Sequence, residues 1–359
     1  MVETIVEAAQ LAFHAANSST GRVIAHSSIP LIIHETWKNT RIDTWSDEIR
    51  RSAEKWLEYA VNEGMAYFLW DDDGIKQLLN FYDPGFMDKY SALTLNAEKA
   101  DVFRVLVSKW IGGIYGDIDT EPLQSPANWI KARDIEPWED HETGAIYNSS
   151  GPVKAIIGLE ADCPPDGDSY WRMGYEYPVQ LTQWAFAFVP EHPILSRFMD
   201  NLLAEFSSIA ANSNGSLTSE SAQSTLRHFD PLILTGPTAF TVAAKTWLEK
   251  SAGLRWNALS GLEDEGRVKL VDDVLVLPIT GFRYSLPRLQ YFIVFGTHII
   301  YSPGRDMYGN MGSKPITDPD ARLLHHAQGS WRNFDLRVEY GKLCRSFLGM
   351  CRDWSKVPN

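Results

Sequence analysis

The sequence is poor in cysteine, in long apolar runs and in excess positive charge. Three cysteines among 359 residues, none of them in a CxxC pair, are too few for a disulfide framework. A bridge between Cys344 and Cys351 is conceivable, although free thiols in a reducing compartment are favoured. No apolar run approaches the ~20 residues of a membrane-spanning helix. The formal net charge of −13 argues against a nucleic-acid partner, because a polyanion is bound by clustered Lys and Arg.

The overall composition is typical of a folded protein. A hydrophobic content of 44% and a charged content of 22% are typical of a globular α/β chain. Residues 1–28 predict a short amphipathic leader helix, and they lack the basic region and long apolar core of a signal peptide. We therefore expect a cytoplasmic protein, or one of the Golgi lumen if the sequence is a catalytic fragment.

From residue 29 onward, strand-like and helix-like stretches alternate along the first half of the chain. This alternation predicts an α/β fold with a mostly parallel central sheet and helices on both faces. Ligands of such sheets gather at the carboxyl ends of the strands. The predicted strands are Ile29–Thr36, Met65–Trp70, Ile114–Ile118 and Lys154–Leu159, and the predicted helices are Asp47–Asn62, with Asp47 as its cap, and Ala97–Trp110. Residues 201–227 predict a helix end followed by an exposed loop.

Two acids lie two residues apart on an extended segment. Asp117 and Asp119 project from the same face there, and neighbouring carboxylates repel each other unless a cation lies beside them. An oxygen-rich site of this kind suits Mg²⁺ or Mn²⁺. Alone, an Asp-x-Asp pair is weak, since a solvated acidic turn has the same pattern. The acidic run Asp71–Asp73 is a rival, expected to be such a turn, and Gly112–Gly113 are expected to allow a tight turn and close approach of a ligand.

The order of residues around this pair is more specific. Asp101 and Arg104 on a helix, the Gly-Gly break and the Asp pair resemble the sugar-binding region with the DXD motif of glycosyltransferase family 32. Within it the chain is most similar to the fungal initiation-specific α-1,6-mannosyltransferases, and the module also resembles that of the large clostridial glucosylating toxins. The resemblance runs from about Ile29 to Arg332 through ordered blocks at Ile29–Asn39, Trp171–Pro193, Leu234–Phe240, Val276–Gly281 and Met311–Trp331.

The resemblance implies a GT-A, Rossmann-like fold and a division of the chain. The catalytic domain would span residues 29–335. Its nucleotide-sugar half would cover about 29–160, and its acceptor-binding and metal-completing half about 161–335. A C-terminal helix would occupy residues 336–359.

Site roles follow from the same resemblance. Asp119 would bind the metal directly, Asp117 would contact the donor and the metal's water shell, and His326 is chosen over His325 as the distal ligand. The implied catalytic residues are Asp117, Asp119, Arg104 and Gln183. The implied donor-binding residues are His34, Thr36, Trp37, Asp101, Arg104, Tyr115, Asp117, Gln180, Ser330 and Trp331. Simpler alternatives are a helix-surface ion pair for Asp101 and Arg104, and core packing for Trp331.

The implied activity is a retaining, Mn²⁺- or Mg²⁺-dependent transfer of mannose from GDP-mannose to a hydroxyl. A UDP-sugar donor, an N-glycan or mannan acceptor and a catalytically silent nucleotide-sugar-binding protein are the alternatives. Because no membrane anchor is recognised, a small lipophilic acceptor is expected. The aromatic stretches Trp171–Tyr177, Trp184–Phe188 and Tyr301–Tyr308 are candidates for the walls of its groove, with ordinary core packing as the other interpretation.

Overall fold

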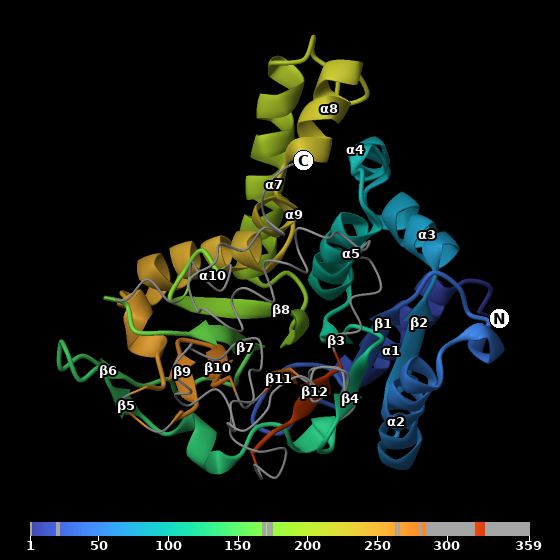
Figure 1. The fold of residues 1–359 in the computed structure, drawn as a ribbon. Helices are drawn as coiled ribbons and strands as arrows, with labels where there is room; N and C mark the ends of the chain where they lie inside the picture. Colours follow the sequence, from blue (N-terminus) through green and yellow to red (C-terminus); the bar gives the residue numbers. More distant parts are fainter. Residues whose placement is uncertain are drawn as a thin grey trace, which may run out of the picture.

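A seven-stranded sheet forms the centre of the molecule (Figure 1). The computed structural model describes residues 2–18, 22–166, 170, 175–262, 264, 266–279, 282–284 and 320–326. In spatial order the strands are β2 (Ala66–Trp70), β1 (Ile32–Thr36), β3 (Gly113–Gly116), β8 (Val179–Phe188), β7 (Ala155–Asp162), β10 (Val274–Leu277) and β9 (Lys269–Val271). Strands β2, β1, β3, β7 and β10 run one way, whereas β8 and β9 run the other. The predicted α/β class with a mostly parallel sheet is confirmed.

Both faces of this sheet are covered, because neighbouring side chains of a strand point to opposite sides. Ile32 joins one core cluster, and Ile33 joins the other. The first cluster packs under helices α1 (Ile5–Ser18), α3 (Asp72–Tyr82), α4 (Met87–Ala92), α5 (Asn96–Trp110), α7 (Pro193–Ala211), α8 (Glu220–His228), α9 (Pro231–Leu234) and α10 (Pro237–Ala252). Helix α2 (Asp47–Glu63) covers the second through the fully buried Trp56. The expected leader helix is α1, and its Val6 and Ala9 belong to the first core cluster.

The predicted helices of the first half have nearly the expected ends, but the one predicted cap is wrong. The cap of α2 is Ser46, whose hydroxyl accepts from the Ile49 N–H, rather than Asp47. The acidic run after β2 is not a solvated turn: Asp71 caps α3, and its side chain accepts from the Gly74 N–H. The helix end predicted within residues 201–227 is the end of α7, but the loop after it is short, because α8 begins at Glu220.

Two glycines join α5 to β3, and both have positive φ angles, +73° at Gly112 and +105° at Gly113. A Cβ atom on Gly113 would lie 2.4 Å from the Ile32 carbonyl oxygen, and one on Gly112 would lie 2.6 Å from Pro190 Cδ. The close approach predicted for these glycines is therefore to neighbouring backbone and to a proline ring, not to a ligand. It lets β3 start directly beside β1.

A small second sheet completes the part of the fold that matters for function. It pairs β4 (Thr120–Pro122) antiparallel with β12 (Leu323–His325), which is parallel to β11 (Phe282–Tyr284). The remaining elements are the hairpin β5 (Trp138–Glu139) and β6 (Ile146–Tyr147) and the 3₁₀ helices η1 (Ile42–Thr44), η2 (Pro84–Phe86), η3 (Pro126–Asn128), η4 (Ala132–Ile135) and η5 (Trp256–Leu259). Among the residues that the structure describes, no helix has the length and apolar character needed to cross a bilayer.

Candidate active site

Arg104 is the centre of a buried ionic network. It lies one turn after Asp101 on α5, and its Nη1 is 2.7 Å from Asp101 Oδ1. Its Nη2 contacts both carboxylate oxygens of Asp117, at 2.9 and 3.2 Å. Only 6% of Arg104 is exposed, and a buried guanidinium needs such partners. Asp101 and Arg104 therefore do not form a surface ion pair of α5.

Asp117 is held by a second donor from its own strand. The Tyr115 hydroxyl donates to Asp117 Oδ1 at 2.7 Å, and the Arg104 guanidinium lies 5.3 Å from the centre of the Tyr115 ring. Burial raises the pKa of Asp117, while Arg104 and the Tyr115 hydrogen bond act against that rise. With Tyr115 and Arg104 both bound to it, the Asp117 carboxylate has a fixed orientation.

Two residues from the second half of the chain close the network. The Gln183 side-chain amide donates to the Thr235 carbonyl at 2.8 Å, and its oxygen lies 3.5 Å from Arg104 Nη1. The Thr235 hydroxyl donates to Asp101 Oδ2 at 3.0 Å. Gln183 was predicted from the sequence, whereas Thr235 was not. The available signal was the Leu234–Phe240 block, which contains Thr235 but suggests no chemistry for it.

Asp117, Asp119 and His325 form a group that could hold a metal ion. Ligand atoms of the three side chains all lie within 4.8 Å of one another. His325 Nε2 is 3.1 Å from Asp119 Oδ1, and its ring stacks on Trp184 with centroids 4.6 Å apart. Pairing of β12 with β4, which places His325 opposite Thr120, brings this histidine to the acids.

The chemistry of this group fits a divalent cation. Two carboxylates are ligands of the kind that Mg²⁺ and Mn²⁺ prefer, and an imidazole extends the choice toward transition metals. The group holds two carboxylates, those of Asp117 and Asp119, against the one guanidinium of Arg104, which contacts Asp117. A bound cation would balance this excess of negative charge.

His326, the predicted metal ligand, makes different contacts. Its Nε2 is 3.0 Å from Glu121 Oε2, and its backbone N–H donates to the Asp119 carbonyl at 2.8 Å. His325 and His326 are consecutive in an extended segment, so their side chains point to opposite faces. The geometry therefore favours His325 over His326.

A further acid of this region, Glu35, was not singled out from the sequence. It is completely buried on β1, and the Tyr67 hydroxyl donates to its Oε2 at 2.5 Å. Burial raises the pKa of Glu35 well above its ordinary value, and the nearby charges of Asp119 and Asp117 act in the same direction. Glu35 therefore favours the neutral form, which adds no negative charge to the site.

The amino-acid sequence around this network matches a known family. Residues 46–136, which include Asp101, Arg104, Asp117 and Asp119, match the family described as "Glycosyltransferase sugar-binding region containing DXD motif". This segment of the chain is therefore similar to a glycosyltransferase sugar-binding region. The resemblance to glycosyltransferase family 32 predicted from the sequence is confirmed.

Curated relatives with this region include fungal mannosyltransferases. The initiation-specific α-1,6-mannosyltransferase of Schizosaccharomyces pombe is 31% identical over 315 residues, which are 86% of this chain and 65% of that protein. Inositol phosphoceramide mannosyltransferase 3 of the same yeast is 30% identical over 29% of this chain and 30% of its own length. Among solved structures, "PaToxG Glycosyltransferase" has 17% identity and a TM-score of 0.31, over 70% of this chain and 78% of that one. This chain thus spans about two thirds, or less, of the length of these curated relatives.

Two residues that the sequence assigns to donor binding, His34 and Thr36, make their contacts within the fold. His34 is completely buried: its Nε2 is 3.0 Å from the Gly112 carbonyl, and its Nδ1 accepts from the Trp70 indole at 3.1 Å. Burial lowers the pKa of His34 to about 4, so it is a neutral core histidine rather than a donor ligand. The Thr36 hydroxyl is also engaged, since it donates to the Trp70 carbonyl.

Trp37 and Gln180 differ in their relation to the site. Trp37 packs against a small hydrophobic cluster that contains Ile118, the residue between Asp117 and Asp119. No described residue accepts from its buried indole N–H, so Trp37 stays a donor-binding candidate. Gln180 instead bonds within the fold, to the Glu176 N–H at 3.1 Å and to Glu160 at 3.5 Å.

Only part of the predicted acceptor groove falls within the described residues. Phe186 and Phe188, from the stretch Trp184–Phe188, are fully buried in β8 and pack against Phe240, so these two are core, whereas Trp184 stacks on His325 of the metal group. Ser330, Trp331, the stretch Tyr301–Tyr308 and most of Trp171–Tyr177 lie outside the described residues.

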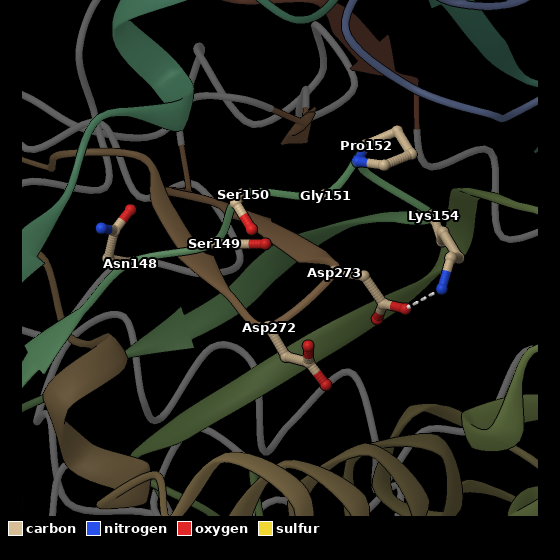
Figure 2. Close-up of a pocket in the computed structure, with 8 residues that line it drawn as sticks. All are labelled: Asn148, Ser149, Ser150, Gly151, Pro152, Lys154, Asp272 and Asp273. Atoms are coloured by element: carbon tan, nitrogen blue, oxygen red, sulfur yellow. Dashed lines mark hydrogen bonds and ion pairs between the residues drawn. The ribbon is translucent and has the colours of Figure 1, made fainter.

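A polar pocket of about 300 Å³ lies apart from this network (Figure 2). Its lining residues are Asn148, Ser149, Ser150, Gly151, Pro152, Lys154, Asp272 and Asp273. Lys154 and His192 both contact Asp273 and hold its pKa down at about 2. None of the acids or histidines of the metal group lines this pocket, and its polar walls are unlike the mostly apolar sites that bind small molecules.

Proposed function

We propose that this protein transfers mannose from GDP-mannose to an acceptor hydroxyl, with retention of anomeric configuration and with the help of Mn²⁺ or Mg²⁺. The observation that carries the proposal is the joining of Asp101, Arg104 and Asp117 into one buried network beside Asp119 and His325. The sequence of this region matches a glycosyltransferase family, and relatives are named as mannosyltransferases.

Each residue has a role that its contacts support. Asp101 and Arg104 would hold hydroxyls of the donor sugar, with Arg104 also keeping Asp117 oriented. Asp119 and His325 would hold the metal ion, with Asp117 beside them. A bound divalent ion would neutralise the negative charge of the diphosphate as it leaves. Tyr115, through its bond to Asp117, would act as a positioning residue.

The stereochemical proposal depends on what lies beside the sugar-binding residues. The buried acids there, Asp101 and Asp117, are both paired with Arg104, which makes them poor nucleophiles. Two uncharged side chains, Gln183 and Tyr115, also contact this guanidinium. We therefore favour front-face substitution, in which the acceptor attacks from the side that the diphosphate leaves. An α-linked product would support retention, and a β-linked product would overturn it.

Release of nucleotide from a panel of GDP- and UDP-sugars, with and without Mn²⁺, tests the donor and the metal together. We expect hydrolysis or transfer with GDP-mannose, loss of it in EDTA and restoration by Mn²⁺. The D119A variant should be inactive while keeping the wild-type circular dichroism spectrum. Full activity in EDTA would overturn the role of the metal. Preference for a UDP-sugar would change the assigned donor from GDP-mannose to that sugar.

The acceptor needs its own assay. A small lipophilic alcohol is the expectation from the sequence, and one relative is named for inositol phosphoceramide, an acceptor that combines hydroxyls with a lipid. Mannose oligosaccharides, inositol phosphoceramide and terpenoid alcohols should be offered in parallel with the same donor. Transfer to the oligosaccharide alone would reject the lipophilic class. The cytoplasmic location expected from the sequence stays a prediction, with the Golgi lumen as the alternative.

A further inference from the structure

The Thr235 hydroxyl lies between two oxygen acceptors in a completely buried position. Asp101 Oδ2 is 3.0 Å away, and the Pro231 carbonyl oxygen is 3.3 Å away. A hydroxyl has one proton to donate and lone pairs with which to accept. It can therefore donate fully to only one of the two at a time.

The turn that carries Thr235 leaves its backbone little freedom. The N–H groups of Thr235 and Gly236 both donate to the Pro231 carbonyl, at 3.0 and 2.9 Å. A Cβ atom on Gly236 would lie 2.7 Å from Leu232 Cα, so another residue cannot replace this glycine without a shift. Pro237 then starts α10 with a fixed φ angle. The position of the hydroxyl is thus set by the backbone.

The two carboxylate oxygens of Asp101 have partners from different parts of the chain. Arg104, on the same helix, contacts Oδ1, and Thr235 donates to Oδ2. Burial raises the pKa of Asp101 to about 7, and the charges of Asp117 and Glu98 act in the same direction. Arg104 and Thr235 oppose that rise. Both protonation states of Asp101 are therefore accessible near neutral pH.

The same threonine is bound to the other side of the network. Its carbonyl accepts from the Gln183 amide at 2.8 Å, and Gln183 in turn lies beside Arg104. Thr235 consequently connects Asp101 on α5 to Gln183 on β8. A displacement of this turn would move Asp101, assigned to the donor sugar, and Gln183, assigned a catalytic role.

We propose that Thr235 is a positioning residue of the donor-sugar site, whose hydroxyl holds the Asp101 carboxyl group in place and whose carbonyl holds Gln183. When Asp101 is ionised, Thr235 donates to its carboxylate. When Asp101 is protonated, its O–H donates to the Thr235 oxygen, and the threonine proton turns to the Pro231 carbonyl. No group moves between these arrangements except the two protons. The inference rests on the proposed function, because it takes Asp101 to contact the sugar.

Substitution of Thr235 by valine and by serine tests this role. T235V keeps the shape of the side chain and removes the hydroxyl, whereas T235S keeps the hydroxyl. Loss of a hydrogen bond to a charged group should raise the KM for the donor about tenfold or more in T235V, with a smaller change in kcat. T235S should stay within about twofold of the wild type.

The pH profile gives a second readout that a structural role alone would not move. The bond from the hydroxyl to the ionised carboxylate is the stronger of the two, because one partner is charged, so the pKa of Asp101 rises when the hydroxyl is removed. The acidic limb of kcat/KM should therefore shift to higher pH in T235V and stay in place in T235S. If T235V does not fold, T235A carries the same expectation, and circular dichroism with thermal melting checks the fold of each variant.

The outcomes separate this inference from the proposed function. If the wild type transfers sugar and a folded T235V, or T235A, matches T235S in KM and pH profile, the role of Thr235 is wrong and the activity stands. If D101N retains the donor KM of the wild type, Asp101 does not contact the sugar and the inference falls with it. If the wild type neither binds nor turns over any nucleotide sugar, both the proposed function and the inference fail.

Discussion

His325 and His326 are neighbours in the chain whose side chains face different partners. His325 lies 3.1 Å from Asp119 and stacks on Trp184, whereas His326 lies 3.0 Å from Glu121. Only the first belongs to the group whose ligand atoms converge within 4.8 Å. The choice between two adjacent histidines is therefore a matter of which face of β12 meets the acids.

We predict that H325A weakens Mn²⁺ binding and that H326A does not. Removal of a ligand should raise the Kd for Mn²⁺ by more than the ~10–100-fold typical of residues that only support a ligand. Titration followed by calorimetry or by the Mn²⁺ electron paramagnetic resonance signal measures this directly, without turnover. H326A serves as the matched control in the same strand, and a larger effect there than in H325A would restore the assignment made from the sequence.

For single residues, the sequence predicts which residues belong to the site better than it predicts the partners that they contact. The order of Asp101, Arg104, Asp117 and Asp119 is visible in the sequence, and all four are close together in the fold. His34, by contrast, looks like a donor ligand until its two ring nitrogens are found bonded to Gly112 and Trp70. Such partners come from distant segments, so a single strand's sequence cannot reveal them.

Strand β12 is anchored on the side opposite to His325. Arg322, 1% exposed, donates from Nη2 to Asp134 Oδ2 and from Nε to the Trp129 carbonyl, both at 2.6 Å. Asp134 is itself held by the Lys131 N–H. Because residues 322 and 325 project from opposite faces of an extended strand, this buried ion pair fixes the strand while leaving the imidazole directed at Asp119.

We predict that R322M reduces both stability and metal affinity. Removal of Arg322 leaves the buried Asp134 carboxylate with the Lys131 N–H and a longer contact to Arg133 at 4.0 Å, and the loss of a buried partner costs about 3–5 kcal/mol in comparable sites. The free energy of unfolding comes from urea titration, and the Kd for Mn²⁺ from calorimetry under folding conditions. The partly exposed pair of Lys131 and Asp320 supplies a control, since K131A should cost at most about 1 kcal/mol. Unchanged Mn²⁺ binding in folded R322M would show that the ion pair does not position His325.

Helices and strands with a clear apolar spacing were predicted well from the sequence. Elements that depend on pairing with a distant segment were not. Helix α5 and strand β3 begin and end within about two residues of their predicted bounds, because apolar spacing and the Gly-Gly break mark them. Helix α3 was missed because its Asp71 cap looks like a solvated turn. Strand β12 has only three residues, too few for any periodicity, and it exists as a strand through its pairing with β4.

At the scale of the whole molecule, nucleotide and metal should act on stability together. A ligand that binds only the native state raises the free energy of unfolding by about 2.7 kcal/mol at a concentration of 100 Kd. We predict that GDP with Mn²⁺ raises the melting temperature more than UDP with Mn²⁺, and that EDTA removes the difference. Differential scanning fluorimetry measures these shifts. Greater protection by UDP would transfer the donor assignment to a UDP-sugar without affecting the fold.

The pairing of β12 with β4 also has a consequence for the order of folding. His325 and Asp119 are 206 positions apart in the chain, so their contact closes a very long loop, and such closures are slow because their entropic cost precedes any compensating contact. During synthesis, Asp101, Arg104 and Asp117 can come together once α5 and β3 have formed. The imidazole cannot join them until the ribosome has passed residue 325. The acid pair therefore forms early, and its histidine partner arrives among the last steps of assembly.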